Sequence, residues 1–239
     1  MSSRERLEPS PIRAVLFDLD GTLYAQSPLR IAMSLEMAIA SAGAVFSQGM
    51  FVPRVIATFR KTREQLRDEP DGGPPIVTRQ YAAAAERLHS STDEVERIVD
   101  EWMYRRPLKW LRYCRRRGLV GLLDWLERRG LRKGVLSDYP ADDKLTALGL
   151  SGRFDLVVSS LDPDVNAFKP NPRGFLAAAT KWGLDPSEVL YVGDRIDVDV
   201  PGARAAGMSC AVLTTRRVDP DVIGIRNLAE LKGVLDPQR

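Results

Sequence analysis

Histidine and cysteine are scarce in this chain of 239 residues, which has one histidine and two cysteines. The single histidine, His89, excludes any mechanism or metal site that needs two imidazoles, and its polar surroundings favour a surface position. Cys114 and Cys210 lie far apart without metal-ligand spacing, so we expect two free thiols. Histidine-pair and cysteine-cluster metal sites are therefore excluded.

Long apolar runs are missing as well, and none approaches the roughly 20 residues that a membrane-spanning helix requires. The N-terminus lacks the apolar stretch of a secretory signal. The net charge of +3 is small for this length and gives no argument for nucleic acid binding. We expect a soluble, cytoplasmic protein with no membrane or nucleic acid partner, and both a monomer and a homodimer are compatible with the sequence.

Five short apolar runs alternate with helical patterns along the chain. Unbroken runs of this kind indicate strands buried on both faces, as in parallel sheets. The expected strands are Ala14 to Phe17, Gly134 to Leu136, Leu156 to Val158, Val189 to Val192 and Cys210 to Leu213. The expected helices, each followed by a glycine, are Leu122 to Arg129, Asp142 to Leu148, Pro172 to Trp182 and Val200 to Ala206. The alternation predicts an α/β fold with a doubly wound parallel sheet.

The segment from residue 24 to residue 117 breaks this alternation, because it carries helix signals and hardly any strand signals. Ser27-Pro28 suits a helix start, with Ser27 as the cap, and Ser91-Thr92-Asp93-Glu94 has the spacing of a capping box. The turn-forming run at 71–75 separates two of the helices. We therefore expect a helical insertion at 24–117 within a core domain made of residues 1–23 and 118–239, of which 1–10 form a flexible tail.

Two aspartates, Asp18 and Asp20, directly follow the first expected strand. Reactive groups in such sheets gather at the carboxyl ends of the strands. In an extended segment both side chains share one face, and Gly21 lets the backbone turn away without steric penalty. One carboxylate can then attack a substrate while the other handles protons.

Three further polar residues, Ser137, Lys169 and Asp194, lie at or just after other strands. Together with the first motif they stand in the stretches Phe17-Asp18-Leu19-Asp20-Gly21-Thr22-Leu23, Val135-Leu136-Ser137, Phe168-Lys169-Pro170-Asn171-Pro172 and Gly193-Asp194-Arg195-Ile196-Asp197-Val198-Asp199. In this order the stretches resemble the signatures of the haloacid dehalogenase-like hydrolase superfamily in its phosphatase form. The resemblance covers essentially all of the chain outside the tail and the insertion, and the insertion resembles the helical cap domain of that family.

The resemblance implies a Mg²⁺-dependent phosphatase that acts on a small phosphorylated metabolite. Asp18 would attack phosphorus and form an aspartyl-phosphate, while Asp20 would protonate the leaving alkoxide and then activate water. The implied ligands of Mg²⁺ are the carboxylates of Asp18 and Asp194 and the backbone carbonyl of Asp20. A hard cation suits this role because a phosphate dianion and a carboxylate nucleophile repel each other.

The resemblance also assigns the remaining polar residues. Lys169 would supply a fixed positive charge, Ser137 a hydrogen bond to a phosphate oxygen, and Thr22 would orient the phosphate-binding loop. Asp199 would position Lys169 or the metal waters, and Asp197 is the less favoured occupant of that role. An alternative for Asp199 is a simple helix cap.

Three rival functions remain open on this scaffold: a phosphomutase, a haloacid dehalogenase, and a non-catalytic binding protein on a retained hydrolase fold. Asp20 argues against the dehalogenase, since halide is a leaving group that needs no acid. The intact carboxylates and Lys169 argue against the binding protein.

For three features the sequence leaves more than one interpretation open. The family commonly has asparagine after the second-motif serine, whereas Asp138 follows Ser137 here. Its carboxylate either points away from the phosphate or points inward and selects a cationic or hydroxyl-bearing leaving group. The basic run Arg105 to Arg117 is expected to be a solvated helix face, with recognition of an anionic substrate tail or of nucleic acid as the alternatives. Tyr24 and Arg30 either contact substrate or serve packing and hinge geometry.

Overall fold

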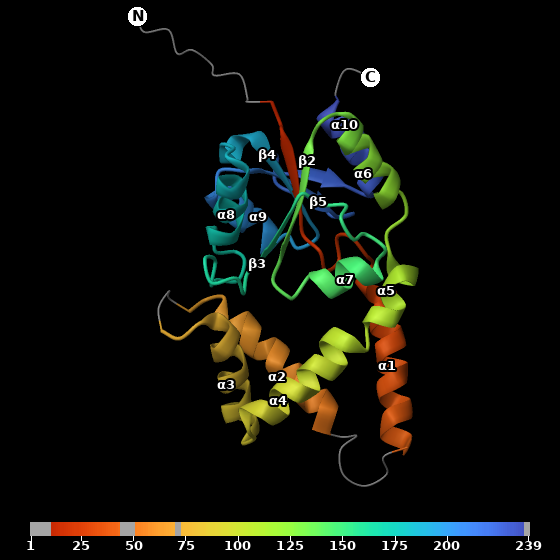
Figure 1. Cartoon of the computed structure of the whole chain (residues 1–239), viewed down its shortest axis with the longest axis vertical. Helices are drawn as coiled ribbons and strands as arrows, with labels where there is room; N and C mark the ends of the chain where they lie inside the picture. The colour runs from red at the N-terminus through yellow and green to blue at the C-terminus, as the bar shows by residue number, and fades with distance from the viewer. Residues whose placement is uncertain (1–10, 44–50, 70–72, 237–239) are drawn as a thin grey trace, which may run out of the picture.

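The structure is a computed structural model that describes residues 11–43, 51–69 and 73–236. Figure 1 shows a sheet flanked by helices at one end of the molecule and a group of helices at the other. The expected tail at 1–10 and Asp71-Gly72 of the expected linker lie outside the described residues.

Six parallel strands form one sheet in the order β3-β2-β1-β4-β5-β6. Their bounds are β1 Ala14–Phe17, β2 Arg132–Ser137, β3 Leu156–Ser159, β4 Val189–Gly193, β5 Ser209–Leu213 and β6 Ile223–Ile225. Five of them are the expected strands. The sixth, β6, has only three residues around a glycine, too few to show a strand pattern in the sequence.

Both faces of the sheet are covered, which confirms the predicted doubly wound α/β fold. Side chains alternate along β1, so Val15 and Phe17 enter one apolar core while Ala14 and Leu16 enter the other. The helices on the first face are α6 (Leu119–Arg128), α7 (Asp142–Ala147) and α10 (Leu231–Leu235). Those on the second face are α8 (Arg173–Trp182) and α9 (Asp199–Ala205). Short 3-10 turns at η2 (Pro186–Glu188) and η3 (Leu228–Glu230) complete this part.

Between β1 and α6, the described part of the chain forms helices joined by loops and adds no strand to the sheet. Its elements are α1 (Gln26–Gly43), α2 (Phe51–Leu66), α3 (Ile76–Leu88), α4 (Thr92–Val99), the π-helical turn η1 (Asp100–Arg105) and α5 (Leu108–Cys114). Helices α2, α3 and α4 share an apolar core of their own, formed around Phe59, Ala84 and Val95. We keep residues 24–117 as the proposed cap domain, supported by this separate core.

The chain leaves the sheet domain for the helical segment once and returns once, and these two connecting stretches lie side by side. The amide of Ala25 donates to the carbonyl of Cys114 at 2.9 Å, and that of Arg116 donates to the carbonyl of Leu23 at 3.0 Å. Helix α1 packs on α5, and α5 packs on α7. The loop that carries Asp18 and Asp20 is therefore held where the helical segment joins the sheet.

Two local expectations have different outcomes. The Ser91 hydroxyl accepts from the amide of Glu94 at 3.2 Å, so Ser91 caps α4 as predicted. The prediction that Ser27 caps α1 is wrong, because the helix begins at Gln26 and places Ser27 in its first turn. Gln26 instead donates through its side chain to the carbonyl of Asp20 at 2.6 Å.

Within the described part of the chain, no helix combines the length and apolar character needed to cross a membrane.

Candidate active site

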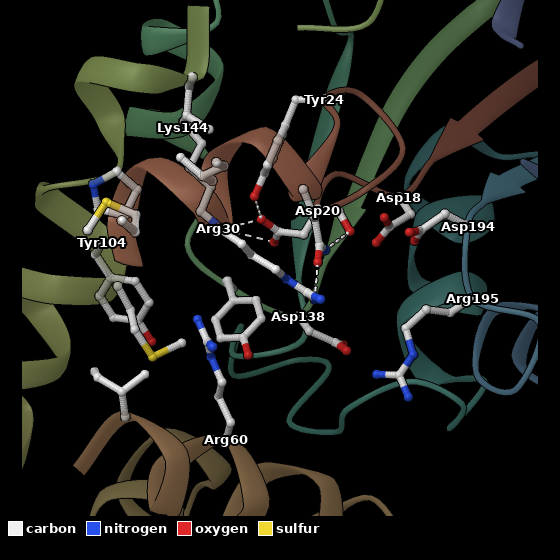
Figure 2. Close-up of a pocket in the computed structure, with 18 of the residues that line it drawn as sticks. Asp18, Asp20, Tyr24, Arg30, Arg60, Tyr104, Asp138, Lys144, Asp194 and Arg195 are labelled. Atoms are coloured by element: carbon white, nitrogen blue, oxygen red, sulfur yellow. Dashed lines mark hydrogen bonds and ion pairs between the residues drawn. The ribbon is translucent and has the colours of Figure 1, made fainter. Parts of the chain in front are cut away.

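A cavity of about 630 Å³ lies between the carboxyl ends of the strands and helices α1 and α2 (Figure 2). Of the residues singled out in the sequence, Asp18, Asp20, Lys169, Asp194 and Asp199 line it. These five residues come from three separate stretches of chain, because β1 and β4 are neighbours in the sheet and the loop before α8 folds over their ends. Tyr24, Arg30 and Asp138 line the cavity as well.

Lys169 is the centre of the buried part of this site. Its Nζ donates to Oδ1 of Asp18 at 2.6 Å, to Oδ1 of Asp199 at 2.8 Å and to the hydroxyl of Tyr191 at 2.9 Å. Burial alone would lower the pKa of Lys169, but the two carboxylates outweigh it and hold this pKa well above the ordinary value. The ammonium group is therefore a fixed positive charge beside Asp18.

Both carboxylate oxygens of Asp199 accept hydrogen bonds from two donors each. Its Oδ2 accepts from the backbone amides of Asp194 at 3.1 Å and Arg195 at 2.9 Å, and its Oδ1 accepts from Lys169 and Tyr191. A Cβ on Gly193 would meet Asp199 Oδ2 at 2.2 Å, so only glycine fits there. The carboxylate thus joins Lys169 to the backbone that carries Asp194, contacts well beyond those of a helix cap.

The less favoured residue, Asp197, lies elsewhere. It is exposed and forms an ion pair with Arg195 at 2.6 Å. No contact between Asp197 and Lys169 occurs in the described structure.

Asp18 and Asp194 each keep one carboxylate oxygen without a partner. Asp18 Oδ2 and Asp194 Oδ1 are buried and accept no hydrogen bond from any described residue, and these two aspartates lie with Asp199 in a group whose oxygens are within 4.8 Å of one another. Burial, followed by the nearby carboxylate of Asp199, raises the pKa of Asp194 to about 6. Burial also raises the pKa of Asp18 well above the ordinary value, against the opposing effect of Lys169.

These unpartnered oxygens fit a hard divalent cation. Two buried, converging carboxylates with a free oxygen each are costly without a counter-charge. Asp199 fits the role of ligand less well, since its oxygens are already engaged. Gly21, at φ +110°, brings the loop so close that a Cβ would meet Asp194 Oδ2 at 2.0 Å. The backbone directly after Asp20 therefore lies against the carboxylate of Asp194.

Asp20 is held by residues outside the first motif. Lys144 Nζ donates to Oδ1 of Asp20 at 2.6 Å and to Oδ2 at 2.9 Å, and the hydroxyl of Tyr24 donates to Oδ1 (Figure 2). Sequence reasoning missed Lys144, because Ala141-Asp142-Asp143-Lys144 is an ordinary polar helix start with no signal that its lysine is buried. Asp20 is thus oriented on both oxygens.

Asp138 is neutralised by an arginine in the turn directly after α2. Its Oδ2 pairs with Arg67 at 2.7 Å, and its Oδ1 accepts from Ser160 at 2.6 Å and from the amide of Lys169 at 3.2 Å. Burial alone would raise the pKa of Asp138, but Arg67, Lys169 and Arg63 outweigh it and hold the pKa below its ordinary range. The acidic side chain therefore forms a buried contact between the turn after α2 and the sheet domain.

Thr22 and Ser137 are buried, and neither side chain lines the cavity. The Thr22 hydroxyl has no hydrogen-bond partner among the described residues. The Ser137 hydroxyl accepts from the amide of Tyr139 at 3.1 Å, an interaction that leaves its own proton available.

The basic run Arg105 to Arg117 lies outside the cavity lining apart from Pro107 and Leu111. Several of its cations form intramolecular contacts. Arg105 pairs with Asp100 at 2.7 Å, Lys109 pairs with Glu36 at 2.9 Å, and Arg116 donates to the carbonyl of Gly21 at 2.6 Å. The last contact supports the loop of the first motif.

We predict that Arg67→Ala destabilises the protein strongly. The change leaves Asp138 buried without its partner, and breaking such a pair costs about 3–5 kcal/mol. Urea unfolding followed by circular dichroism should show this loss, whereas Arg54→Ala, a change of an exposed arginine in α2, should stay within about 0.5 kcal/mol of the wild type. The double variant Arg67→Ala with Asp138→Asn should recover part of the loss. An Arg67→Ala protein as stable as the wild type would show that the pair contributes nothing.

Comparison with known proteins identifies the family. A family model for the haloacid dehalogenase-like hydrolases matches residues 12–207. The chain is 31% identical over 219 residues to N-acetylmuramic acid 6-phosphate phosphatase of Pseudomonas aeruginosa, covering 88% of this chain and 85% of that protein. It is 29% identical to glyceraldehyde 3-phosphate phosphatase of Methanopyrus kandleri, with 82% of each chain covered.

A solved structure agrees with these relatives. The crystal structure of a HAD phosphatase from Thermococcus onnurineus superposes with a TM-score of 0.66 at 25% identity, covering 95% of this chain and 100% of that one. The chain belongs to the haloacid dehalogenase-like hydrolase family.

Proposed function

We propose that this hydrolase removes phosphate from a small phosphorylated metabolite, with Asp18 as the nucleophile and Mg²⁺ as the cofactor. The observation that carries the proposal is the convergence of Asp18, Asp194 and Lys169, with the ammonium group 2.6 Å from Asp18. The phosphatase names of the relatives support the same reaction class. We also propose that the protein is cytoplasmic, which only the sequence supports.

The chain's own groups would bring a phosphate ester and a carboxylate together despite their like charge. Lys169 places one positive charge beside Asp18, and the free oxygens of Asp18 and Asp194, with the carbonyl of Asp20, would hold Mg²⁺. When bound, the cation supplies positive charge that screens the phosphate dianion from the attacking carboxylate. Asp199 keeps Lys169 oriented through its contact at 2.8 Å.

The chemistry proceeds in two displacements. A carboxylate oxygen of Asp18 attacks phosphorus, the ester P–O bond breaks, and Asp20 gives its proton to the departing alkoxide oxygen. Water then attacks the phosphorus of the aspartyl-phosphate, Asp20 takes its proton, and the bond to Asp18 breaks to release inorganic phosphate. Lys144 and Tyr24 orient Asp20 for both proton transfers.

A panel of phosphomonoesters assayed for inorganic phosphate tests this function. We expect release with Mg²⁺ from p-nitrophenyl phosphate and from several metabolites. A lack of release from every ester would contradict the proposal. An isomerised phosphosugar without free phosphate would favour the mutase instead, and chloride release from a 2-chloro acid would favour the dehalogenase.

Metal removal should stop the reaction. Treatment with EDTA is expected to lower phosphate release to background, and added Mg²⁺ should restore it, because the carboxylates of Asp18 and Asp194 lack another counter-charge for their free oxygens. Asp194→Asn should raise the Mg²⁺ concentration needed for half-maximal rate by about 10-fold or more. Full activity in EDTA would show that the reaction needs no divalent cation.

A further inference from the structure

We infer that the substrate's leaving group carries a second oxyanion, a carboxylate or a second phosphoryl group, bound between Arg30 of α1 and Arg60 of α2. This inference rests on the proposed phosphatase function and names the substrate class. Figure 2 shows both arginines reaching into the cavity from helices of the proposed cap, with Asp18 and Asp194 on the side of the sheet.

Arg60 has no carboxylate partner. It lines the cavity, its side chain is exposed, and no ion pair or hydrogen bond joins it to any other described residue. All five N–H donors of its guanidinium group are therefore free to bind a ligand.

Arg30 is placed by a chain of two hydrogen bonds. Its Nη2 donates to the side-chain oxygen of Gln26, whose Nε2 donates to the carbonyl of Asp20 at 2.6 Å. Gln26 is a neutral partner, so Arg30 also keeps its charge uncompensated and retains free donors. The two hydrogen bonds hold Arg30 near the loop that carries Asp18 and Asp20.

The four other cations that line the cavity are each matched by an acid. The pairs are Lys144 with Asp20 at 2.6 Å, Lys169 with Asp18 at 2.6 Å, Arg67 with Asp138 at 2.7 Å and Arg195 with Glu64 at 3.0 Å. Two unmatched guanidinium groups facing one cavity create a positive region separate from Lys169. Their planar forks suit an oxyanion, which either can bind through two N–H groups.

Apolar side chains also contribute to the lining of this cavity. Met33, Ile56, Trp102 and Met103 line the same cavity. A ligand with an anionic group at each end and a short carbon skeleton between them suits a lining that combines unmatched cations with apolar side chains. The cavity of about 630 Å³ has ample room for such a molecule.

Matched ester pairs test the inference. Each pair differs only in a carboxylate replaced by hydroxymethyl: 2-phosphoglycolate with 2-hydroxyethyl phosphate, 3-phosphoglycerate with glycerol 3-phosphate, and 6-phosphogluconate with sorbitol 6-phosphate. Fructose 1,6-bisphosphate against fructose 6-phosphate supplies the phosphoryl arm. We expect kcat/KM to favour the second anion by about 10-fold or more in at least one pair.

The arginine variants show whether these residues cause the preference. Arg60→Gln and Arg30→Gln should each bring the ratio of kcat/KM within the favoured pair close to one. Arg54→Gln, a matched change of an exposed arginine on α2 outside the cavity lining, should keep the ratio. No preference in any pair, or a preference that survives both cavity variants, would overturn the inference.

Binding separates this inference from the proposed function. Calorimetric titration of each pair into Asp18→Asn measures the preference without turnover. Tighter Arg60-dependent binding of the ester that carries the second anion, in a protein whose wild type releases no phosphate, would refute the phosphatase and support the second-anion site. Phosphate release without any preference would refute the site alone.

Discussion

Asp18→Asn is expected to lower phosphatase activity by at least about 10⁴-fold, to the level of the uncatalysed reaction in the assay. An amide oxygen is a poor nucleophile toward phosphorus, and the change also removes one of the two carboxylates that carry an unpartnered oxygen. The shape of the side chain is kept. Inorganic phosphate released from p-nitrophenyl phosphate with Mg²⁺ is the measurement.

The fold of this variant should survive, because Lys169 keeps Asp199 as its partner at 2.8 Å. Circular dichroism and the midpoint of thermal unfolding should therefore stay near those of the wild type. Asp197→Asn provides the matched control, since Asp197 is exposed and pairs with Arg195 outside the Lys169 cluster. Turnover by Asp18→Asn at near the wild-type rate would remove Asp18 as the nucleophile.

Lys169→Met is the second variant with a large expected effect, and it should damage both activity and stability. Removing the ammonium group leaves Asp18 and Asp199 buried without the cation that lies 2.6 Å and 2.8 Å from them. Loss of one partner from a buried charge cluster costs about 3–5 kcal/mol in the free energy of unfolding. Loss of a charge that stabilises the transition state should reduce kcat by about 10³-fold.

A double variant separates the two effects. Lys169→Met with Asp199→Asn removes one of the stranded charges, so urea unfolding should show part of the stability restored. Activity should stay low, because the positive charge beside Asp18 is still missing. If the double variant regained wild-type kcat along with its stability, Lys169 would have a purely structural role.

The sheet and the polar residues at its edge were predictable because both depend on short stretches of sequence. A four-residue apolar run such as Ala14 to Phe17 shows burial on both faces, and Asp18 stands at its end by simple adjacency. The parallel pairing of β1 with β4 then brings Asp194 beside Asp18. Family resemblance supplied the roles proposed for these residues, which no spacing argument would have given.

The contacts between the helical segment and the sheet domain were not predictable. Arg67 and Asp138 meet only because the end of α2 and the turn after it pack over the loop after β2. Nothing in the sequence around either residue indicates that the other is its partner. Lys144 is hidden for the same reason, since its contact with Asp20 depends on where α7 lies in space. Local capping signals were also too weak to fix every helix start, as Gln26 rather than Ser27 begins α1.

Chemical trapping during turnover tests the central claim most directly. The enzyme, mixed with p-nitrophenyl phosphate and Mg²⁺, is quenched in acid within milliseconds and reduced with borohydride, which converts an aspartyl-phosphate to homoserine. Mass spectrometry of the peptides should find homoserine at position 18 only when substrate is present. Steady phosphate release with Asp18 unmodified, or homoserine at another aspartate, would contradict the mechanism.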